Sequence, residues 1–226
     1  MVQKEQRYQY LTMLIMFYLT VDLTCLALTY KFIEIDTIKT SIEIFLFPLT
    51  YTLTDIIAEV YGYNEAKKAI WMVFVCDFLF AFFTYLGVHI HSFNSSQQAA
   101  YVSVFGLLLR GSAAEILGVL SGIFINIYLI SKLKILARGR YFWLRSITSS
   151  TLGEAVLLII SMPIIFAGRV STSDLMMIII STYIYKIVFA LVMALPANLL
   201  ANTLKRKEAT DVFDYNTKFS PFIIER

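Results

Sequence analysis

Eight ionisable side chains lie inside long apolar segments of this 226-residue chain: Asp22, Asp55, Glu59, Asp77, Arg110, Glu115, Glu154 and Lys186. At the centre of a membrane helix each would cost ~2.5–3.5 kcal/mol on insertion scales, so each is expected to face a cavity or a partner. Six acids stand against two bases, and pairing alone cannot neutralise that excess of negative charge. We therefore expect some carboxyl groups to be protonated, to face a solvated cavity, or to bind a cationic or hydrogen-donating ligand.

The segment 47–63 carries the densest group of such side chains. At 100° per residue, one face of a helix there would present Pro48, Tyr51, Thr52, Asp55, Glu59 and Gly62. The opposite face is apolar and suits lipid or neighbouring helices; it holds Leu49, Leu53, Ile56, Ile57 and Val60. Pro48 is expected to free a backbone carbonyl upstream and to permit a kink. Glu59 has a simpler alternative, an interfacial position beside Lys67.

A stripe of small residues occupies a later segment. One helical face there holds Gly111, Glu115, Gly118, Gly122 and Asn126, at spacings of 4, 3, 4 and 4. Small residues let a second helix or a ligand approach the backbone closely. The pair Gly118 and Gly122 alone favours plain helix packing, whereas Glu115 within the stripe indicates a cavity wall. Arg110 lies outside the stripe near the predicted external end, where it either snorkels or pairs.

The rise of a helix places the buried charges at two depths. Asp55, Asp77 and Glu154 would lie ~9–12 Å from the cytoplasmic face, and Asp22, Glu115 and Lys186 ~18–21 Å from it. These layers suit a polar pocket near the midplane with a proton path below it, for which Asp22 and Asp77 are candidate coupling groups. Lys186 is expected to pair with an acid, because an unpaired ammonium inside a membrane is costly.

Other patterns do not predict catalysis, a metal or a cofactor. Cys25 and Cys76 stand apart in apolar segments and are interpreted as core thiols. His89 and His91 sit at the outer end of a segment without a third ligand nearby. A Walker A sequence does not occur, so the chain cannot hydrolyse ATP itself. A pairing of Ser112 with His89 would lack an orienting group and an oxyanion site, so we expect no enzyme.

These side chains require helices that cross a membrane. Hydrophobic residues make up 58% of the chain, charged residues only 15%, and the mean hydropathy is +0.72. Soluble domains carry ~25% charged residues, so the composition excludes an ordinary soluble enzyme, a disordered chain and a coiled coil. Apolar runs that do not alternate exclude a β-barrel. We predict an all-α integral membrane protein with six transmembrane helices, at about 8–30, 41–61, 69–90, 102–131, 146–168 and 176–204.

Basic residues then predict the orientation. Fourteen of them lie in the two terminal segments and in alternate loops, and three, Lys31, Lys39 and Arg169, lie in the opposite loops. This asymmetry predicts that both termini are cytoplasmic. The first apolar segment follows Lys4 and Arg7 but is long and lacks a small-x-small cleavage site at its end, so we interpret it as a retained signal helix. Residues 1–204 would form one transmembrane domain, 91–98 an external loop, and 205–226 a short cytoplasmic tail. The run 205–207 is interpreted as a topology signal rather than a nucleic-acid patch, because the net charge is only +3.

The stretch 47–63, followed by Ala66-Lys67-Lys68-Ala69-Ile70-Trp71, resembles the signature of the queuosine precursor transporter family. Supporting matches, in family order, are Arg110-Gly111-Ser112, Ser131-Lys132-Leu133-Lys134, Trp143-Leu144-Arg145, Gly153-Glu154, and Tyr183-x-x-Lys186 with Pro196. The resemblance implies a six-helix importer of 7-deazaguanines in a prokaryotic inner membrane. Its cargo would be the 7-cyano or 7-aminomethyl precursor of queuosine, or queuine, for tRNA modification. Matching polar positions are Asp55, Glu59, Arg110, Glu154 and Lys186.

The chemistry of such a base fits these residues. A guanine-like ring presents an N–H and an amine side by side, which one carboxylate can accept together. Its carbonyl oxygen needs a donor such as Lys186 or Arg110, and Tyr51 or Tyr183 could stack on the ring. The predicted binding residues are Tyr51, Asp55, Glu59, Arg110, Glu115, Asn126, Glu154 and Lys186. Three positions depart from the family pattern: Asn126 and Leu157 stand where Asp is expected, and Asp22 where Asn is usual.

The sequence thus predicts a transporter without its own ATPase, either driven by an ion gradient or facilitative. Alternatives are a substrate-binding membrane subunit that works with a separate ATPase module, and a transporter of another purine-like base. A cation channel would explain the acidic excess but not the aromatic face, and a membrane enzyme would lack a nucleophile or metal. The expected partners are the small-molecule base and the lipid bilayer, not nucleic acid. The sequence is compatible with a homo-oligomer as well as with a monomer.

Overall fold

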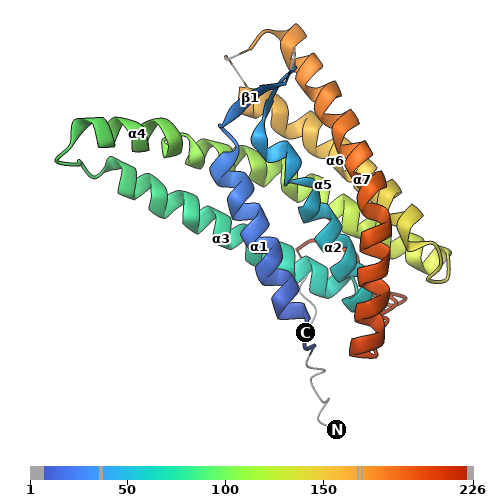
Figure 1. Ribbon diagram of the computed structural model, residues 1–226. Helices are drawn as coiled ribbons and strands as arrows, with labels where there is room; N and C mark the ends of the chain where they lie inside the picture. The colour runs from blue at the N-terminus through green and yellow to red at the C-terminus, as the bar shows by residue number, and fades with distance from the viewer. Residues whose placement is uncertain (1–7, 36–37, 167, 169, 223–226) are drawn as a thin grey trace.

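The computed structural model describes residues 8–35, 38–166, 168 and 170–222, and side-chain positions are not described for part of the first half of α5 and for the tip of the β-hairpin. Helices dominate the chain (Figure 1). In chain order the elements are α1 (Leu11–Leu28), β1 (Phe32–Ile35), β2 (Ile38–Ser41), the 3₁₀ helix η1 (Ile42–Phe45), α2 (Pro48–Tyr61), α3 (Tyr63–His89), α4 (Ser95–Phe105), α5 (Leu108–Leu136), α6 (Phe142–Phe166) and α7 (Thr172–Glu208).

Five helical segments of the described chain are long and apolar enough to cross a membrane: Leu11–Leu28, Ile42–Tyr61, Tyr63–His89, Phe142–Phe166 and Thr172–Glu208. The helical fold class is confirmed, and the chain is a multi-pass membrane protein. At 29 residues, α5 is about 43 Å long. That length exceeds the ~30 Å hydrocarbon core.

Two predicted spans are not continuous helices. In place of a helix over 41–61, the structure has η1 and then the 14-residue α2, which alone is about 21 Å long. In place of a helix over 102–131, α4 ends at Phe105 and α5 begins at Leu108. The piece expected as an external loop is helical from Ser95 onward, because Asn94 caps the amide groups of Ser96 and Gln97.

Pro48 begins a helix instead of kinking one. It is the first residue of α2, where its missing N–H is not needed and its fixed φ suits a helix start. A short antiparallel hairpin, β1 with β2, precedes this start and pairs Phe32 with Ser41. The hairpin was not predicted, since its two strands are only four residues each.

The core of the molecule is α2. It packs against α1, α3, α5, α6 and α7, and 83% of the segment that contains it is buried (Figure 1). Its apolar face therefore contacts neighbouring helices and not lipid, with Leu53, Ile56, Ile57 and Val60 each at most 4% exposed. A short, largely enclosed helix with one polar face is the element that brings charged residues of α5, α6 and α7 together.

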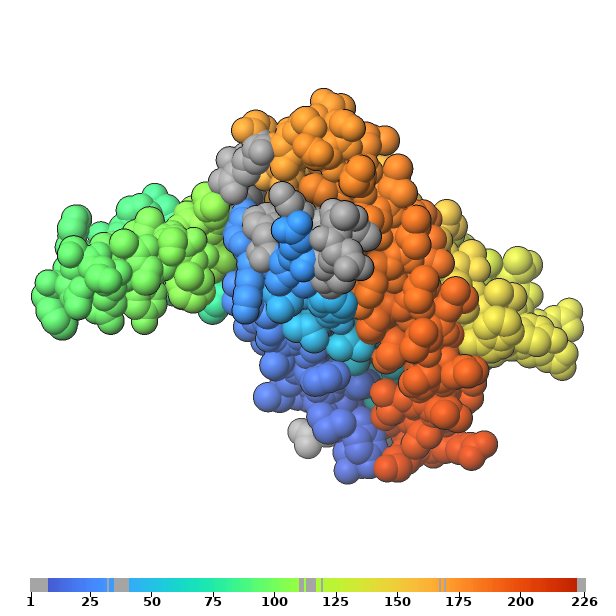
Figure 2. All heavy atoms as spheres, turned by 45° about the horizontal axis from the view of Figure 1, so that its top comes forward, coloured from blue at the N-terminus to red at the C-terminus, as the bar shows by residue number. Residues whose placement is uncertain are grey.

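An arm extends away from this core (Figures 1 and 2). It consists of the C-terminal part of α3, the whole of α4 and the start of α5. Large apolar side chains cover the described part of its surface, including Phe82, Phe83, Leu86, Tyr101 and Val104. Such a surface suits the hydrocarbon of a bilayer, which solvates apolar side chains as well as a protein core does.

Residues 209–222, which we name the C-terminal strap, pack back onto the end of the bundle. The Val212 amide donates to the Val60 carbonyl, the Tyr63 amide donates to Asp214, and the Trp71 indole donates to the Pro221 carbonyl. The strap passes over the turn between α2 and α3, where Gly62 has a φ of +88°. A Cβ on Gly62 would lie 2.7 Å from Val212, so glycine serves both the backbone and the close approach.

Candidate substrate-binding cleft

Three buried polar clusters follow one another along the polar face of α2. The first joins α6 to α7 through Glu154 and Lys186, whose Oε2 and Nζ atoms lie 2.5 Å apart. Both side chains are 5% exposed. The Lys186 ammonium also lies 4.2 Å from the centre of the Phe47 ring, a cation–π contact that helps to compensate its burial. The prediction that Lys186 pairs with an acid is confirmed.

Two polar atoms beside this ion pair have no hydrogen-bond partner among the described residues. They are the Tyr51 hydroxyl and Glu154 Oε1, and both are buried. A buried polar group without a partner costs about 1–3 kcal/mol, so such groups mark strained or ligand-binding positions. The two atoms supply a hydroxyl that can donate or accept and a carboxylate oxygen that accepts.

The second cluster surrounds Asp55, which is fully buried. The Asn126 amide of α5 donates to its Oδ1 atom at 2.6 Å. Two hydroxyl groups of α6, those of Ser146 and Ser150, donate to its Oδ2 atom, the second at 3.0 Å. All three donors are neutral, and none of the ion pairs of the described chain includes Asp55.

The third cluster is an ion network around Glu59. Its carboxylate accepts hydrogen bonds from both terminal nitrogens of Arg145, at 2.8 and 3.0 Å, and from Lys205 Nζ at 2.5 Å. Lys134 donates to the Glu59 carbonyl at 2.5 Å, and Asp211 of the strap bridges Lys134 and Lys205. Burial alone would raise the pKa of Asp211, but hydrogen bonds from these two lysines outweigh it and hold the pKa below its usual value.

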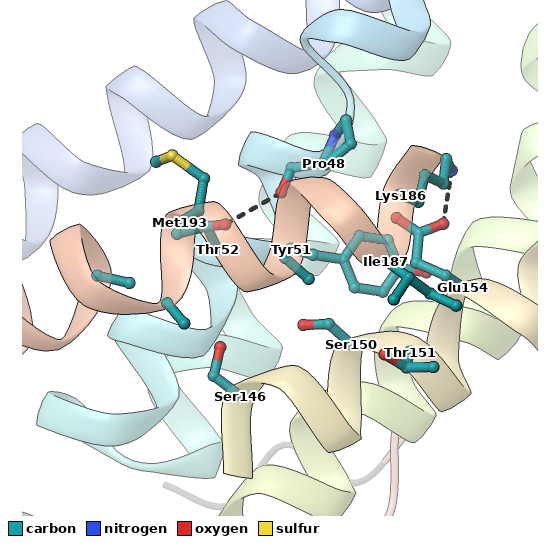
Figure 3. Close-up of a pocket in the computed structure, with 13 residues that line it drawn as sticks. Pro48, Tyr51, Thr52, Ser146, Ser150, Thr151, Glu154, Lys186, Ile187 and Met193 are labelled. Carbon is teal, nitrogen blue, oxygen red and sulfur yellow. Dashed lines mark hydrogen bonds and ion pairs between the residues drawn. The ribbon is translucent and has the colours of Figure 1, made fainter. Parts of the chain in front are cut away.

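A cleft between α2, α6 and α7 opens onto the first two clusters (Figure 3). Its empty volume, including the part open to the outside, is about 400 Å³. Polar groups line one side and small or apolar groups the other: Pro48, Tyr51, Thr52, Ser146, Ser150, Thr151, Glu154, Lys186, Ile187, Ala190, Met193, Ala194 and Ala197. An apolar cleft with a few convergent polar groups is the usual form of a small-molecule site.

Comparison of the sequence with known proteins identifies a family of transporters. Residues 41–201 match a family described as "Putative vitamin uptake transporter". The chain belongs to this family. A relative in Bacillus subtilis (strain 168), described as "Probable queuosine precursor transporter", is 27% identical over 165 residues, which cover 72% of each protein. Solved structures provide no significant match.

Membership makes the chain a membrane transporter rather than an enzyme. The matched region begins at Ser41, the last residue of β2, includes η1 and α2 to α6, and ends seven residues before the end of α7. It therefore contains every residue that lines the cleft, from Pro48 to Ala197.

The cleft of this transporter brings together Tyr51, Glu154 and Lys186 of the predicted binding residues. Asp55 and Asn126 lie directly behind it, bonded to each other. Glu59 lies in the ion network, where its ion-pair partners are Arg145 and Lys205. The side chains of Arg110 and Glu115 lie outside the described residues.

Asp22 of α1 and Asp77 of α3 do not line the cleft. Both interact electrostatically with Tyr18 on the other side of α2. The depth estimate was wrong for Glu154 and Lys186, which were expected about 9 Å apart in depth and are in contact. Helical rise gives a depth only for helices that run straight across the membrane from one common level, whereas membrane helices are tilted by about 20° on average.

The small-residue stripe packs α5 against α6. A Cβ on Gly118 would lie 2.7 Å from the Ser161 side chain, and one on Gly122 would lie 2.6 Å from the Gly153 carbonyl. The packing interpretation of this pair is therefore confirmed, and the close approach brings Asn126 within reach of Asp55.

Several residues of the site were missed in the sequence. Ser146 and Ser150 were not predicted, although they precede the predicted Glu154 at spacings of four and form a polar stripe with it in the apolar segment of α6. Arg145, Lys134 and Lys205 were counted as topology signals, and they also form the Glu59 network. Phe47 carried no signal, because a cation–π contact depends on where a distant lysine folds.

Proposed function

We propose that this transporter imports a 7-deazaguanine queuosine precursor, or the queuine base, across a prokaryotic inner membrane. The description of the Bacillus subtilis relative supports the substrate class. The observation that carries the proposal is the pair of unpartnered buried polar atoms, Tyr51 hydroxyl and Glu154 Oε1, at a cleft that also holds the Lys186 ammonium.

The ring edge of a 7-deazaguanine complements these groups. Its N–H and exocyclic amine donate to the Glu154 carboxylate, which offers about four lone-pair positions and gives only one contact to Lys186. Its carbonyl oxygen accepts from Lys186, and the Tyr51 ring offers an apolar face and a hydroxyl to the base. Small side chains of α7, Ala190, Ala194 and Ala197, leave space for the ring.

The test is uptake of labelled 7-cyano-7-deazaguanine, its 7-aminomethyl analogue and queuine into proteoliposomes that contain this chain alone. We expect uptake that unlabelled substrate competes for, with and without an imposed pH gradient. Glu154→Gln should weaken substrate binding by about 10- to 150-fold, because a charge-assisted hydrogen bond contributes about 1.5–3 kcal/mol. Asp174→Asn, at the exposed start of α7, is the matched control and should not change binding.

Other outcomes decide among the alternatives. Uptake only after addition of an ATPase module would support a substrate-binding subunit in place of a self-sufficient carrier. Competition by guanine but by none of the 7-deazaguanines would support transport of another purine-like base. Absence of specific uptake under all of these conditions would contradict the proposal.

We also propose six membrane crossings with both termini in the cytoplasm. The five apolar helical segments and the 29-residue α5 supply the crossings, with η1 and α2 together forming the second. The excess of basic residues in the terminal segments and alternate loops supports the orientation. The strap and the Glu59 network would then lie at the cytoplasmic end of one transmembrane domain.

A further inference from the structure

We propose that Asp55 is the proton-binding group that couples this transporter to a proton gradient, and that Ser146 and Ser150 pass its protonation state to the cleft. This inference rests on the proposed function for the identity of the driven substrate. It assigns the coupling role to α2 and α6, in place of Asp22 and Asp77.

The partners of the three carboxylates along α2 differ in kind. Glu154 and Glu59 are held by lysine and arginine, whose nitrogens only donate hydrogen bonds. A proton added to either acid would leave a buried cation without its counter-charge, which costs several kcal/mol. Asp55 is held by one amide and two hydroxyl groups, which can each donate or accept. Among these three sites, only Asp55 can gain a proton without leaving an unpaired charge.

The Asn126 side chain suits both protonation states of Asp55. Its Nδ2 atom donates to the Asp55 carboxylate, while its Oδ1 atom is buried and has no partner among the residues that the structure describes. Rotation of the amide by 180° would turn this oxygen toward Asp55, where it accepts from a protonated carboxyl group. After this rotation, Asn126 would supply the acceptor that a protonated Asp55 needs, from the position where its Nδ2 atom now donates.

The two serines connect Asp55 to the cleft. Ser146 and Ser150 both line it (Figure 3). Both donate their hydroxyl hydrogens to Asp55 Oδ2. One proton from water on the open side of the cleft adds to a carboxylate oxygen, and no other covalent bond changes. When that proton is on Oδ2 it donates to one serine oxygen, and the serine hydrogen is released to donate into the cleft. The proton leaves when the cleft faces the opposite side and the carboxylate forms again.

The cations around Asp55 are already held in ion pairs, and Asp22 and Asp77 share a hydrogen bond with each other. On α2, the titratable neighbours of Asp55 are Tyr51 and Glu59. The helices packed against α2 contribute further charged or titratable groups: Lys134 from α5, Arg145 and Glu154 from α6, Lys186 and Lys205 from α7, Tyr18 and Asp22 from α1, and Asp77 from α3. The cations among these form ion pairs with Glu59, Glu154 or Asp211. Asp55 is therefore free to titrate without breaking an ion pair.

Transport in proteoliposomes tests the coupling role. One proton per substrate and a gradient of one pH unit, worth 1.36 kcal/mol, support at most about tenfold accumulation. Asp55→Asn keeps the size of the side chain and resembles the protonated form, so we expect accumulation to fall to about onefold while exchange of internal for external substrate continues. Asp174→Asn should accumulate substrate like the unmodified protein. Gradient-driven accumulation by Asp55→Asn would overturn the proposal.

Infrared spectroscopy provides a second readout that needs no substrate. Carbonyl-stretch bands of protonated buried carboxyl groups should appear as pH falls in the unmodified protein and in Asp174→Asn, and the component that belongs to Asp55 should be missing in Asp55→Asn. Ser150→Ala should shift the frequency of this component, because it removes one hydrogen-bond partner. A set of bands unaffected by Asp55→Asn would overturn the proposal. If no 7-deazaguanine is transported, the proposed substrate fails and the infrared result still decides the proton site.

Discussion

Replacing Gly122 with alanine should separate α5 from α6 and damage the cleft. The new Cβ would lie 2.6 Å from the Gly153 carbonyl, 2.7 Å from the Tyr51 hydroxyl and 2.8 Å from Leu157 Cβ. Two of these three neighbours belong to the α6 backbone or the start of a side chain, so they can retreat only if the helix moves. Overpacking of this kind costs about 1–3 kcal/mol, although alanine returns about 0.5–1 kcal/mol of helix propensity.

Gly87 offers a matched control, since it lies in α3 and a Cβ there would meet nothing within 4 Å. Thermal unfolding in detergent at one fixed scan rate should show Gly122→Ala unfolding up to about 10 °C lower, since 1 kcal/mol shifts the midpoint by ~2–4 °C at this size. Gly87→Ala should unfold at the same temperature or slightly higher. Uptake should fall only in Gly122→Ala, because Tyr51 lies at the point of contact. Equal midpoints for the two variants would refute the packing argument.

Three further predictions concern the charges and the topology. Lys186→Met should destabilise the protein by about 3–5 kcal/mol, since it leaves Glu154 buried without a cation, and adding Glu154→Gln should restore much of the midpoint but not uptake. The lowered pKa of Asp211 means that its contribution to strap binding is present above the unfolded pKa and is lost as pH falls through the folded pKa. Proteolysis of residues 209–222 should therefore accelerate only in acid for the unmodified protein, and at neutral pH for Asp211→Asn; unchanged cleavage would contradict this. In a cysteine-free background, a cysteine at Ser95 should react with an impermeant maleimide from outside intact cells, and one at Tyr215 only after lysis; the reverse pattern would refute the orientation.

Local properties of the sequence were enough to predict the helical membrane class. Apolar runs of about 20 residues select membrane helices, because every backbone polar group must be satisfied inside the lipid. The same rule required a partner for Lys186 and indicated that the polar face of 47–63 would be buried. The motif around Asp55 led to the transporter family, which the match over residues 41–201 confirms. The bounds of α2 and the break before α5 were not predicted, since both depend on which neighbours enclose the backbone.

The choice of partner for each buried charge came only from the tertiary structure. Hydrophobicity tells that an intramembrane charge is costly, but it does not tell which distant side chain compensates it. Lys186 finds Glu154 at a separation of 32 residues, Asp55 finds Asn126 at 71, and Glu59 finds Lys205 at 146. Those choices divide three similar acids into one at the cleft, one whose hydrogen-bond donors are all neutral, and one in a closed ion network. Because each environment is built from several helices, their different chemistry follows from the packing around α2 and not from any local pattern.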